Sequence, residues 1–121
     1  MSPLAQRFAD AVRTLVGDGS VKVRLAQAYA ANLADLADVE FPAGLRRDFA
    51  ELQVALNRIA PVGSESRVRA SVQKMSPDEA GSHAATIVRL YVELLNSVER
   101  AEPLKVVTTQ KKPPQYLTNR S

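Results

Sequence analysis

The segment MSPDEAGSHAATIVRLYVELLNSVER, residues 75–100, decides the fold. Its start carries three helix signals: the Ser76 hydroxyl can cap the first turn, Pro77 fits the first helical position, and Glu79 completes a capping box. The apolar residues that follow recur at steps of three and four, the spacing of one buried helix face: Ala80, Ala84, Ile87, Tyr91, Leu94 and Val98. We therefore expect a helix that ends near Arg100 and forms the central post of a helical bundle.

The chain before this segment shows the same apolar spacing in four shorter pieces. Ser2 and Pro3 begin the first helix, and the glycine-rich turn at residues 17–20 ends it. The second predicted helix covers residues 21–37 and is rich in alanine, which leaves small surfaces where another helix can approach. The third and fourth helices are predicted from Pro42 to Ile59 and from Ser64 or Ser66 to Lys74. Ten residues are expected to form the core: Phe8, Leu25, Tyr29, Leu33, Phe49, Leu52, Leu56, Ile87, Tyr91 and Leu94.

The last segment differs from the rest of the chain. Pro103 predicts the end of the central helix, residues 106–109 are β-branched and resist helix, and residues 111–114 (Lys-Lys-Pro-Pro) favour an extended, polyproline-like backbone. The sequence thus predicts an all-α fold: a compact bundle of four to five helices over residues 1–102. An extended, partly disordered basic tail over residues 103–121 is expected to follow.

Charge divides the chain in the same way. Of the 16 Lys and Arg residues, four lie in residues 103–121, where there is no acidic residue. The other twelve are balanced by 13 Asp and Glu residues, so residues 1–102 carry a net charge of −1. The N-terminal segment has no continuous apolar run typical of a signal peptide, and no stretch approaches the length of a membrane span. We therefore expect a cytoplasmic protein that does not contact membranes.

Residues for catalysis or metal binding are few. His83 is the only histidine, four residues after Glu79, and there is no cysteine, whereas a zinc site needs three or four ligands. The close carboxylate pairs fit helix capping or solvated helix faces, and the turn at residues 17–19 lacks the third glycine of a dinucleotide-binding loop. The sequence predicts no catalytic site, cofactor or metal and hence no enzyme. A cavity converging on Glu79 and His83 would reverse that prediction.

Surplus apolar residues indicate a protein partner. They lie beyond the main stripe of the central helix and in the tail, where they could pair as a strand with a partner's sheet: Val88, Leu90, Leu95, Leu104, Val106 and Val107. The leading hypothesis is a non-enzymatic protein–protein interaction module, a small cytosolic adaptor or regulator. It would dock on another protein or associate with itself as a homo-oligomer.

The alternative hypothesis is an accessory protein that contacts nucleic acid. Basic residues lie on the predicted fourth helix and in the tail, where one aromatic ring could stack on a base: Arg67, Arg69, Lys74, Lys105, Lys111, Lys112, Tyr116 and Arg120. Exposed basic helix faces are common in proteins that bind nothing, so the basic patch alone supports only a weak contact.

Overall fold

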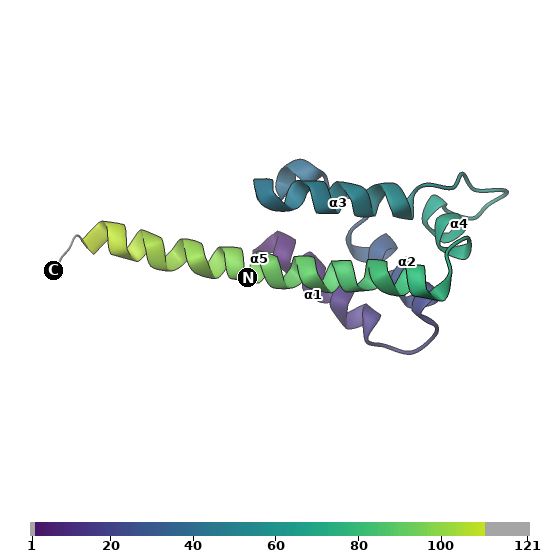
Figure 1. Cartoon of the computed structure of the whole chain (residues 1–121), viewed down its shortest axis with the longest axis horizontal. Coiled ribbons are helices and arrows are strands. Elements are labelled where there is room, and N and C mark those ends of the chain that lie inside the picture. Colours follow the sequence, from purple (N-terminus) through teal and green to yellow (C-terminus); the bar gives the residue numbers. More distant parts are fainter. Residues whose placement is uncertain (1, 111–121) are drawn as a thin grey trace.

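The computed structural model describes residues 2–110, with side chains for residues 2–97. Every regular element in that part of the chain is helical, so the prediction of an all-α bundle is confirmed (Figure 1). The elements in chain order are α1 (Pro3–Leu15), α2 (Val21–Asn32), the 3-10 helix η1 (Asp38–Glu40), α3 (Ala43–Leu56), α4 (Arg67–Gln73) and α5 (Pro77–Gln110).

Serine residues begin four of the five α-helices. The side-chain hydroxyls of Ser2, Ser20 and Ser66 each accept a backbone N–H three residues later, at 3.1–3.2 Å. At α5 the contact is reciprocal, because Ser76 Oγ accepts the Glu79 N–H at 3.0 Å while Glu79 Oε1 accepts the Ser76 N–H at 3.4 Å. The capping box predicted at the start of α5 is thus formed. Of the two serines predicted to cap α4, Ser66 does so and Ser64 does not.

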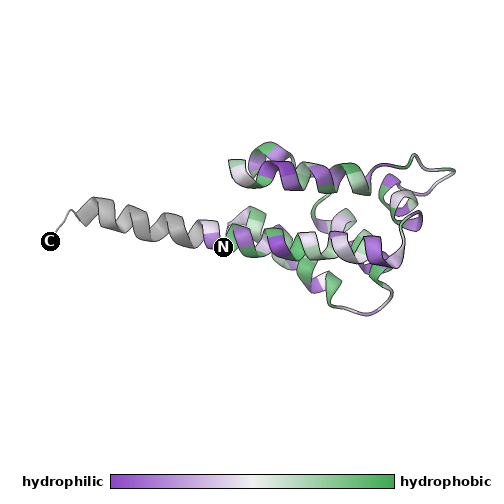
Figure 2. Cartoon of the chain, in the orientation of Figure 1, coloured by the Kyte–Doolittle hydropathy of each residue, from purple (hydrophilic) through white to green (hydrophobic). Residues whose placement is uncertain are grey.

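Helix α5 is the central post of the bundle, since α1, α2 and α3 all contact it. Figure 1 shows α3 running alongside α5 on one side and α1 on the other, with α4 near the start of α5. Figure 2 shows polar and apolar segments alternating along the helices, as expected of elements that bury one face. Nine of the ten predicted core residues are buried, and the tenth, Tyr91, packs against the core while partly exposed.

Three phenylalanines form the aromatic centre of this core. Phe41 stacks on Phe49 with ring centroids 4.2 Å apart, and Phe8 meets the edge of Phe41 at 5.7 Å. Such pairs are favourable beyond the area they bury. Phe41 lies in a connection, outside any helical stripe, so the sequence did not mark it as core although it is only 2% exposed.

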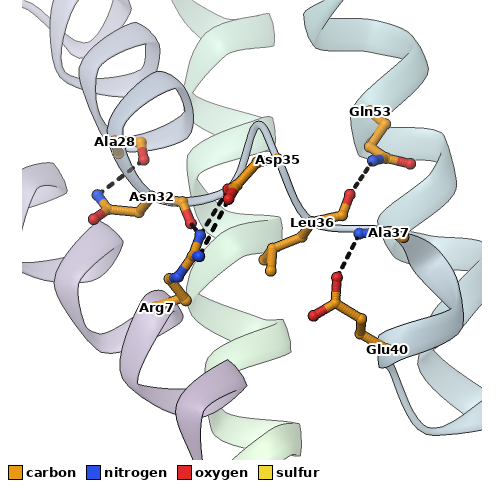
Figure 3. Close-up of polar contacts among 8 residues, drawn as sticks. All are labelled: Arg7, Ala28, Asn32, Asp35, Leu36, Ala37, Glu40 and Gln53. Atoms are coloured by element: carbon orange, nitrogen blue, oxygen red, sulfur yellow. Dashed lines mark hydrogen bonds and ion pairs between the residues drawn. The ribbon is translucent and has the colours of Figure 1, made fainter.

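Helix α2 ends at Asn32, five residues before the predicted end at Ala37. The guanidinium of Arg7 explains the early end, because it donates to the Asn32 carbonyl at 3.0 Å and to both carboxylate oxygens of Asp35 at 2.7 and 3.2 Å (Figure 3). A carbonyl without a helical partner is thereby satisfied from α1. The same guanidinium lowers the pKa of the Asp35 carboxyl, chiefly through its hydrogen bond, and a backbone hydrogen bond lowers it further.

The connection between α2 and α3 is held by two further side chains, also drawn in Figure 3. Gln53 of α3 donates its amide to the Leu36 carbonyl at 2.8 Å, and Glu40 accepts the Ala37 N–H at 2.9 Å. Leu36 remains buried in spite of the non-helical backbone around it. The apolar spacing therefore identified the buried residues correctly and the backbone conformation wrongly.

Helix α3 also ends earlier than predicted, at Leu56 and not at Ile59. The Asn57 side-chain amide donates to the Gln53 carbonyl at 2.8 Å and to the Tyr29 hydroxyl at 3.2 Å. Asparagine readily satisfies backbone groups locally, which favours helix ends over helix interiors. Burial raises the pKa of Tyr29, which therefore packs as a neutral phenol under the end of α3.

Helix α5 continues to Gln110, past the predicted end near Arg100 and past Pro103. Figure 1 shows this last part extending beyond the other helices. The prediction of a stop at Pro103 and of extended backbone at residues 106–109 is wrong. A proline in a helix interior removes one backbone hydrogen bond and costs about 3 kcal/mol, and each β-branched residue costs less than about 0.7 kcal/mol; α5 continues in spite of these costs.

Candidate functional site

The first hollow to consider lies between α3 and α5 and contains the only histidine. It has a volume of about 150 Å³ and is called here the α3/α5 hollow; its lining residues are Asp48, Glu51, Leu52, His83, Thr86 and Arg89. Glu79 is absent from this lining and serves the cap of α5. This hollow therefore does not bring Glu79 and His83 together.

The carboxylates of the α3/α5 hollow are paired with arginines. Arg89 contacts Asp48 at 3.1 Å and Glu93 at 2.9 Å, and Arg47 contacts Glu51 at 3.3 Å. Both acidic partners raise the pKa of Arg89, chiefly through hydrogen bonds. Among the described side chains, no group of three or more His, Cys, Asp or Glu residues is arranged to hold a metal ion. The hollow therefore presents neutralised charge to solvent.

The surplus apolar residues of α5 fall into two groups. Leu90 is fully buried beside Ile87 and Leu94, so its place among the interaction candidates is wrong; it lies three residues after one core residue and four before the other. Val88 is 40% exposed and Leu95 is half-buried.

Val92, which the sequence analysis did not select, is 48% exposed and one helical turn after Val88. The outward stripe of α5 is therefore Val88, Val92 and Leu95. The side chains of Leu104, Val106 and Val107 lie outside those described, although their backbone belongs to α5.

The basic residues of α4 are exposed but do not form one patch. Arg67 donates to the Asn57 carbonyl at 3.0 Å, which directs it towards the end of α3, whereas Arg69 lines hollows on the α2 side. Lys74 follows the last turn of α4. Lys22 of α2 donates to the Gln73 carbonyl at 3.1 Å and brings a further cation against α4. The tail candidates lie outside the described side chains: Lys105, Lys111, Lys112, Tyr116 and Arg120.

Two adjoining hollows run between α2 and α4, and together they are called here the α2/α4 groove. The first has a volume of about 280 Å³, and its lining residues are Ser20, Lys22, Val23, Ala26, Arg69, Val72 and Gln73. The second has a volume of about 120 Å³, and its lining residues are Ala26, Gln27, Ala30, Ser66, Val68 and Arg69. The first hollow joins the start of α2 to the end of α4, and the second joins the later part of α2 to the start of α4. The two helices are therefore antiparallel.

The walls of the α2/α4 groove are apolar and its rim is basic. Val23 is 47% exposed, and two small residues, Ala26 and Ala30, continue its face along α2. No acidic residue lines either hollow, and neither Lys22 nor Arg69 forms an ion pair within residues 2–97. The groove therefore combines uncovered apolar surface with unneutralised positive charge.

Buried contacts fix the position of α4, and with it the groove. Ser71 is 1% exposed, and its hydroxyl accepts the Ile59 N–H at 2.9 Å, which ties α4 to the connection from α3. Val68 and Val72, predicted as the buried side of this helix, are 7% and 3% exposed. A helix of only seven residues is too short to be stable alone, so these contacts decide whether the groove exists.

Sequence reasoning missed most of the α2/α4 groove. It identified the buried stripe of α2 and the alanines, but not Val23 or Lys22. A signal was present, since Val23, Ala26 and Ala30 are separated by three and four residues and so form a second stripe on α2. Nothing in the sequence indicated that α4 would lie antiparallel to α2 and provide the other wall.

No protein-family model, curated protein or solved structure matches this chain. Within the described residues, no helix has the length and apolar character needed to cross a membrane. The described residues form a small all-α bundle with an apolar, basic-rimmed groove between α2 and α4.

Proposed function

We propose that this chain is a non-enzymatic protein–protein interaction module, a small cytosolic adaptor or regulator whose docking surface is the α2/α4 groove. One observation carries the proposal: the groove leaves apolar side chains exposed, and its two cations, Lys22 and Arg69, form no ion pair within residues 2–97. Protein–protein interfaces typically have an apolar core surrounded by a polar rim. The module function follows the leading expectation from the sequence but moves its site from α5 to α2 and α4.

The division of the groove into two depressions favours a protein over a small molecule. Ligand pockets for small molecules are typically single clefts or cavities that bury most of the ligand. The two hollows measure about 280 and 120 Å³ and share Ala26 and Arg69, so they form a shallow furrow with two depressions. A furrow between antiparallel helices suits side chains presented by another protein.

A display experiment with the full chain tests this function. A library of helical peptides and small domains is selected against the wild-type protein, and the enriched ligands are then measured against Ala30→Trp. Ala30 is exposed and lines the second hollow, so tryptophan fills the groove without entering the core. The matched control is Ala31→Trp, because Ala31 is also exposed on α2 but lines neither hollow.

We expect the enriched ligands to bind wild type and Ala31→Trp alike and to lose at least tenfold in affinity for Ala30→Trp. Circular dichroism and thermal melting confirm that both variants fold. Ligands that bind Ala30→Trp as well as wild type, or a selection without enrichment, would overturn the groove as docking surface.

Self-association remains part of the proposed function. The outward stripe of α5 offers half-buried and exposed apolar surface at i, i+4 and i+7, the seam spacing of helices that pair with each other. Light scattering across a concentration series measures it, with Val88→Ser/Val92→Ser as the variant expected to shift a dimer to monomer. A wild-type mass that stays at 13.1 kDa at every concentration would remove this element of the proposal.

A second candidate function, contact with nucleic acid, is favoured by the cations near α4. Lys22, Arg58, Arg69 and Lys74 form no ion pair within residues 2–97. The test is binding to mixed-sequence DNA and RNA at low and moderate salt, with the full chain and with a version ending at Glu102. This function predicts affinity that falls steeply with salt, and a loss on truncation would assign the contact to residues 103–121.

A further inference from the structure

We infer that the occupant of the α2/α4 groove is an amphipathic helix of another protein whose apolar face is flanked by acidic residues. This inference rests on the proposed function and specifies its partner. Both its shape requirement and its charge requirement follow from the residues that line the groove.

The shape requirement comes from the antiparallel walls. The two depressions lie along α2 at Val23 and at Ala30, seven residues apart, which is about 10 Å at 1.5 Å per residue. A helix laid in the furrow presents side chains at positions i and i+7 with the same separation. Two large apolar residues at those positions therefore fit the two depressions, as in helix-in-groove recognition.

Small residues between the depressions permit close approach. Ala26 lines both hollows, and Ala30 is exposed beside the second. Packed helices lie about 8–10 Å apart depending on the side chains at the contact, and alanine allows the shorter distances. The floor beneath them is already closed by Val68 and Val72, so the occupant rests on a preformed surface.

The charge requirement comes from the two walls separately. Lys22 projects from α2 and Arg69 from α4, so each helix contributes one cation to the rim, and the Lys22 ammonium also donates to the Gln73 carbonyl at the end of α4. Asp18 and Glu65, the acidic residues that precede the two helices, do not line the groove. A helix with carboxylates on both edges of its apolar face is complementary to this arrangement. Such rim pairs contribute chiefly to specificity and association rate, while the apolar side chains provide affinity.

The same charges argue against the chain's own C-terminal segment as the occupant. Residues 103–121 carry four basic residues and no acidic residue, so they would place like charges against Lys22 and Arg69. Like charges held together across an interface are costly. A separate protein with an acidic helix meets both requirements.

The test begins with the ligands selected as described above. Their sequences are expected to show apolar residues at i, i+3 or i+4, and i+7, with Glu or Asp on both flanks. The strongest is synthesised as a labelled peptide together with a version in which every acidic residue is lysine. Fluorescence anisotropy measures both against wild type, Lys22→Glu/Arg69→Glu, and the charge-matched control Arg58→Glu/Lys74→Glu, whose residues lie outside the groove.

We expect the acidic peptide to lose at least tenfold in affinity for Lys22→Glu/Arg69→Glu and less than threefold for the control. The lysine peptide is expected to reverse this order and to bind Lys22→Glu/Arg69→Glu more tightly than wild type. Ligands that depend on Ala30 but lack acidic flanks or helical spacing would overturn this inference and leave the proposed function intact. Ligands indifferent to Ala30→Trp would overturn both. Salt-dependent binding of mixed-sequence DNA or RNA that Lys22→Glu/Arg69→Glu abolishes, without any peptide ligand, would make the groove a polyanion site instead.

Discussion

The α3/α5 hollow and the α2/α4 groove are concave surfaces of one bundle with opposite chemistry. The hollow holds the single histidine and two carboxylates, both of which are paired with arginines. Asp48 contacts Arg89 at 3.1 Å and Glu51 contacts Arg47 at 3.3 Å, while Arg89 also contacts Glu93 at 2.9 Å. The groove holds fewer charged residues, but its two cations have no carboxylate partner within residues 2–97 and its walls are apolar. Charged groups without ion pairs and exposed apolar side chains therefore mark a surface for recognition better than the number of titratable residues it contains.

The largest expected effect concerns the core that supports both concave surfaces. Phe49 is fully buried and stacks on Phe41, so Phe49→Ala leaves a cavity in the aromatic centre. We expect the free energy of unfolding to fall by about 3–5 kcal/mol. Chemical denaturation followed by circular dichroism measures this loss. Because the hollow and the groove rest on one core, unfolding should remain a single transition; separate transitions for α3/α5 and α2/α4 would break the comparison.

The next effect distinguishes the groove from the hollow. Ser71→Ala removes the acceptor for the Ile59 N–H and leaves a partly buried donor without a partner, which typically costs about 1–3 kcal/mol. We expect faster amide hydrogen exchange in α4 than in α5. Ser82→Ala, an exposed change on α5, is the control and should leave exchange unchanged. Equal acceleration in α4 and α5 would show that Ser71 does not specifically hold the groove.

A smaller pair of effects uses the helix caps. Ser66→Ala removes the cap of α4 and Ser76→Ala the cap of α5, and each should cost about 1 kcal/mol. The two substitutions should destabilise different helices. Loss of a cap should matter more to α4, which has seven residues, than to α5, which has 34. Peptide binding at the groove should weaken with Ser66→Ala and stay unchanged with Ser76→Ala. The opposite order would contradict the role of α4 as a wall of the groove.

The smallest effect is expected in the α3/α5 hollow itself. Arg89 is 47% exposed and pairs with Asp48 and Glu93, so solvent screens both contacts. Arg89→Gln should change the free energy of unfolding by at most about 1 kcal/mol and should leave peptide binding unaffected. Thermal melting at low and high salt measures the first, and anisotropy the second. A loss of ligand binding in Arg89→Gln would move the recognition surface from the groove to the hollow.

The sequence predicts the fold well because the signals that define it are local. The serine caps and the apolar spacing of α5 specify where helices begin and which faces are buried. The early end of α2 was not predictable in this way, because it depends on Arg7 reaching Asn32 and Asp35 from another helix. The continuation of α5 through Pro103 was missed because an interior proline, which costs about 3 kcal/mol, is a strong local stop signal and no local signal opposed it.

The candidate site was less predictable than the fold. The surplus apolar residues of α5 were identified from the sequence, but Leu90 is part of the core. When apolar residues cover more than one face of a helix, the sequence alone does not show which of them the neighbouring helices bury. The groove requires the pairing of Lys22 and Val23 with Arg69 across 46 to 47 positions of sequence. No local pattern encodes that pairing, so only the tertiary structure brings the site together.

The most direct test of the central claim is mapping of backbone amide chemical shifts on addition of the selected acidic helical peptide to the full chain. The largest shifts are expected at Val23, Ala26, Ala30, Val68 and Arg69, while the amides around Asp48, His83 and Arg89 should not shift. Shifts concentrated around the α3/α5 hollow or along the outward stripe of α5, with α2 and α4 silent, would contradict it.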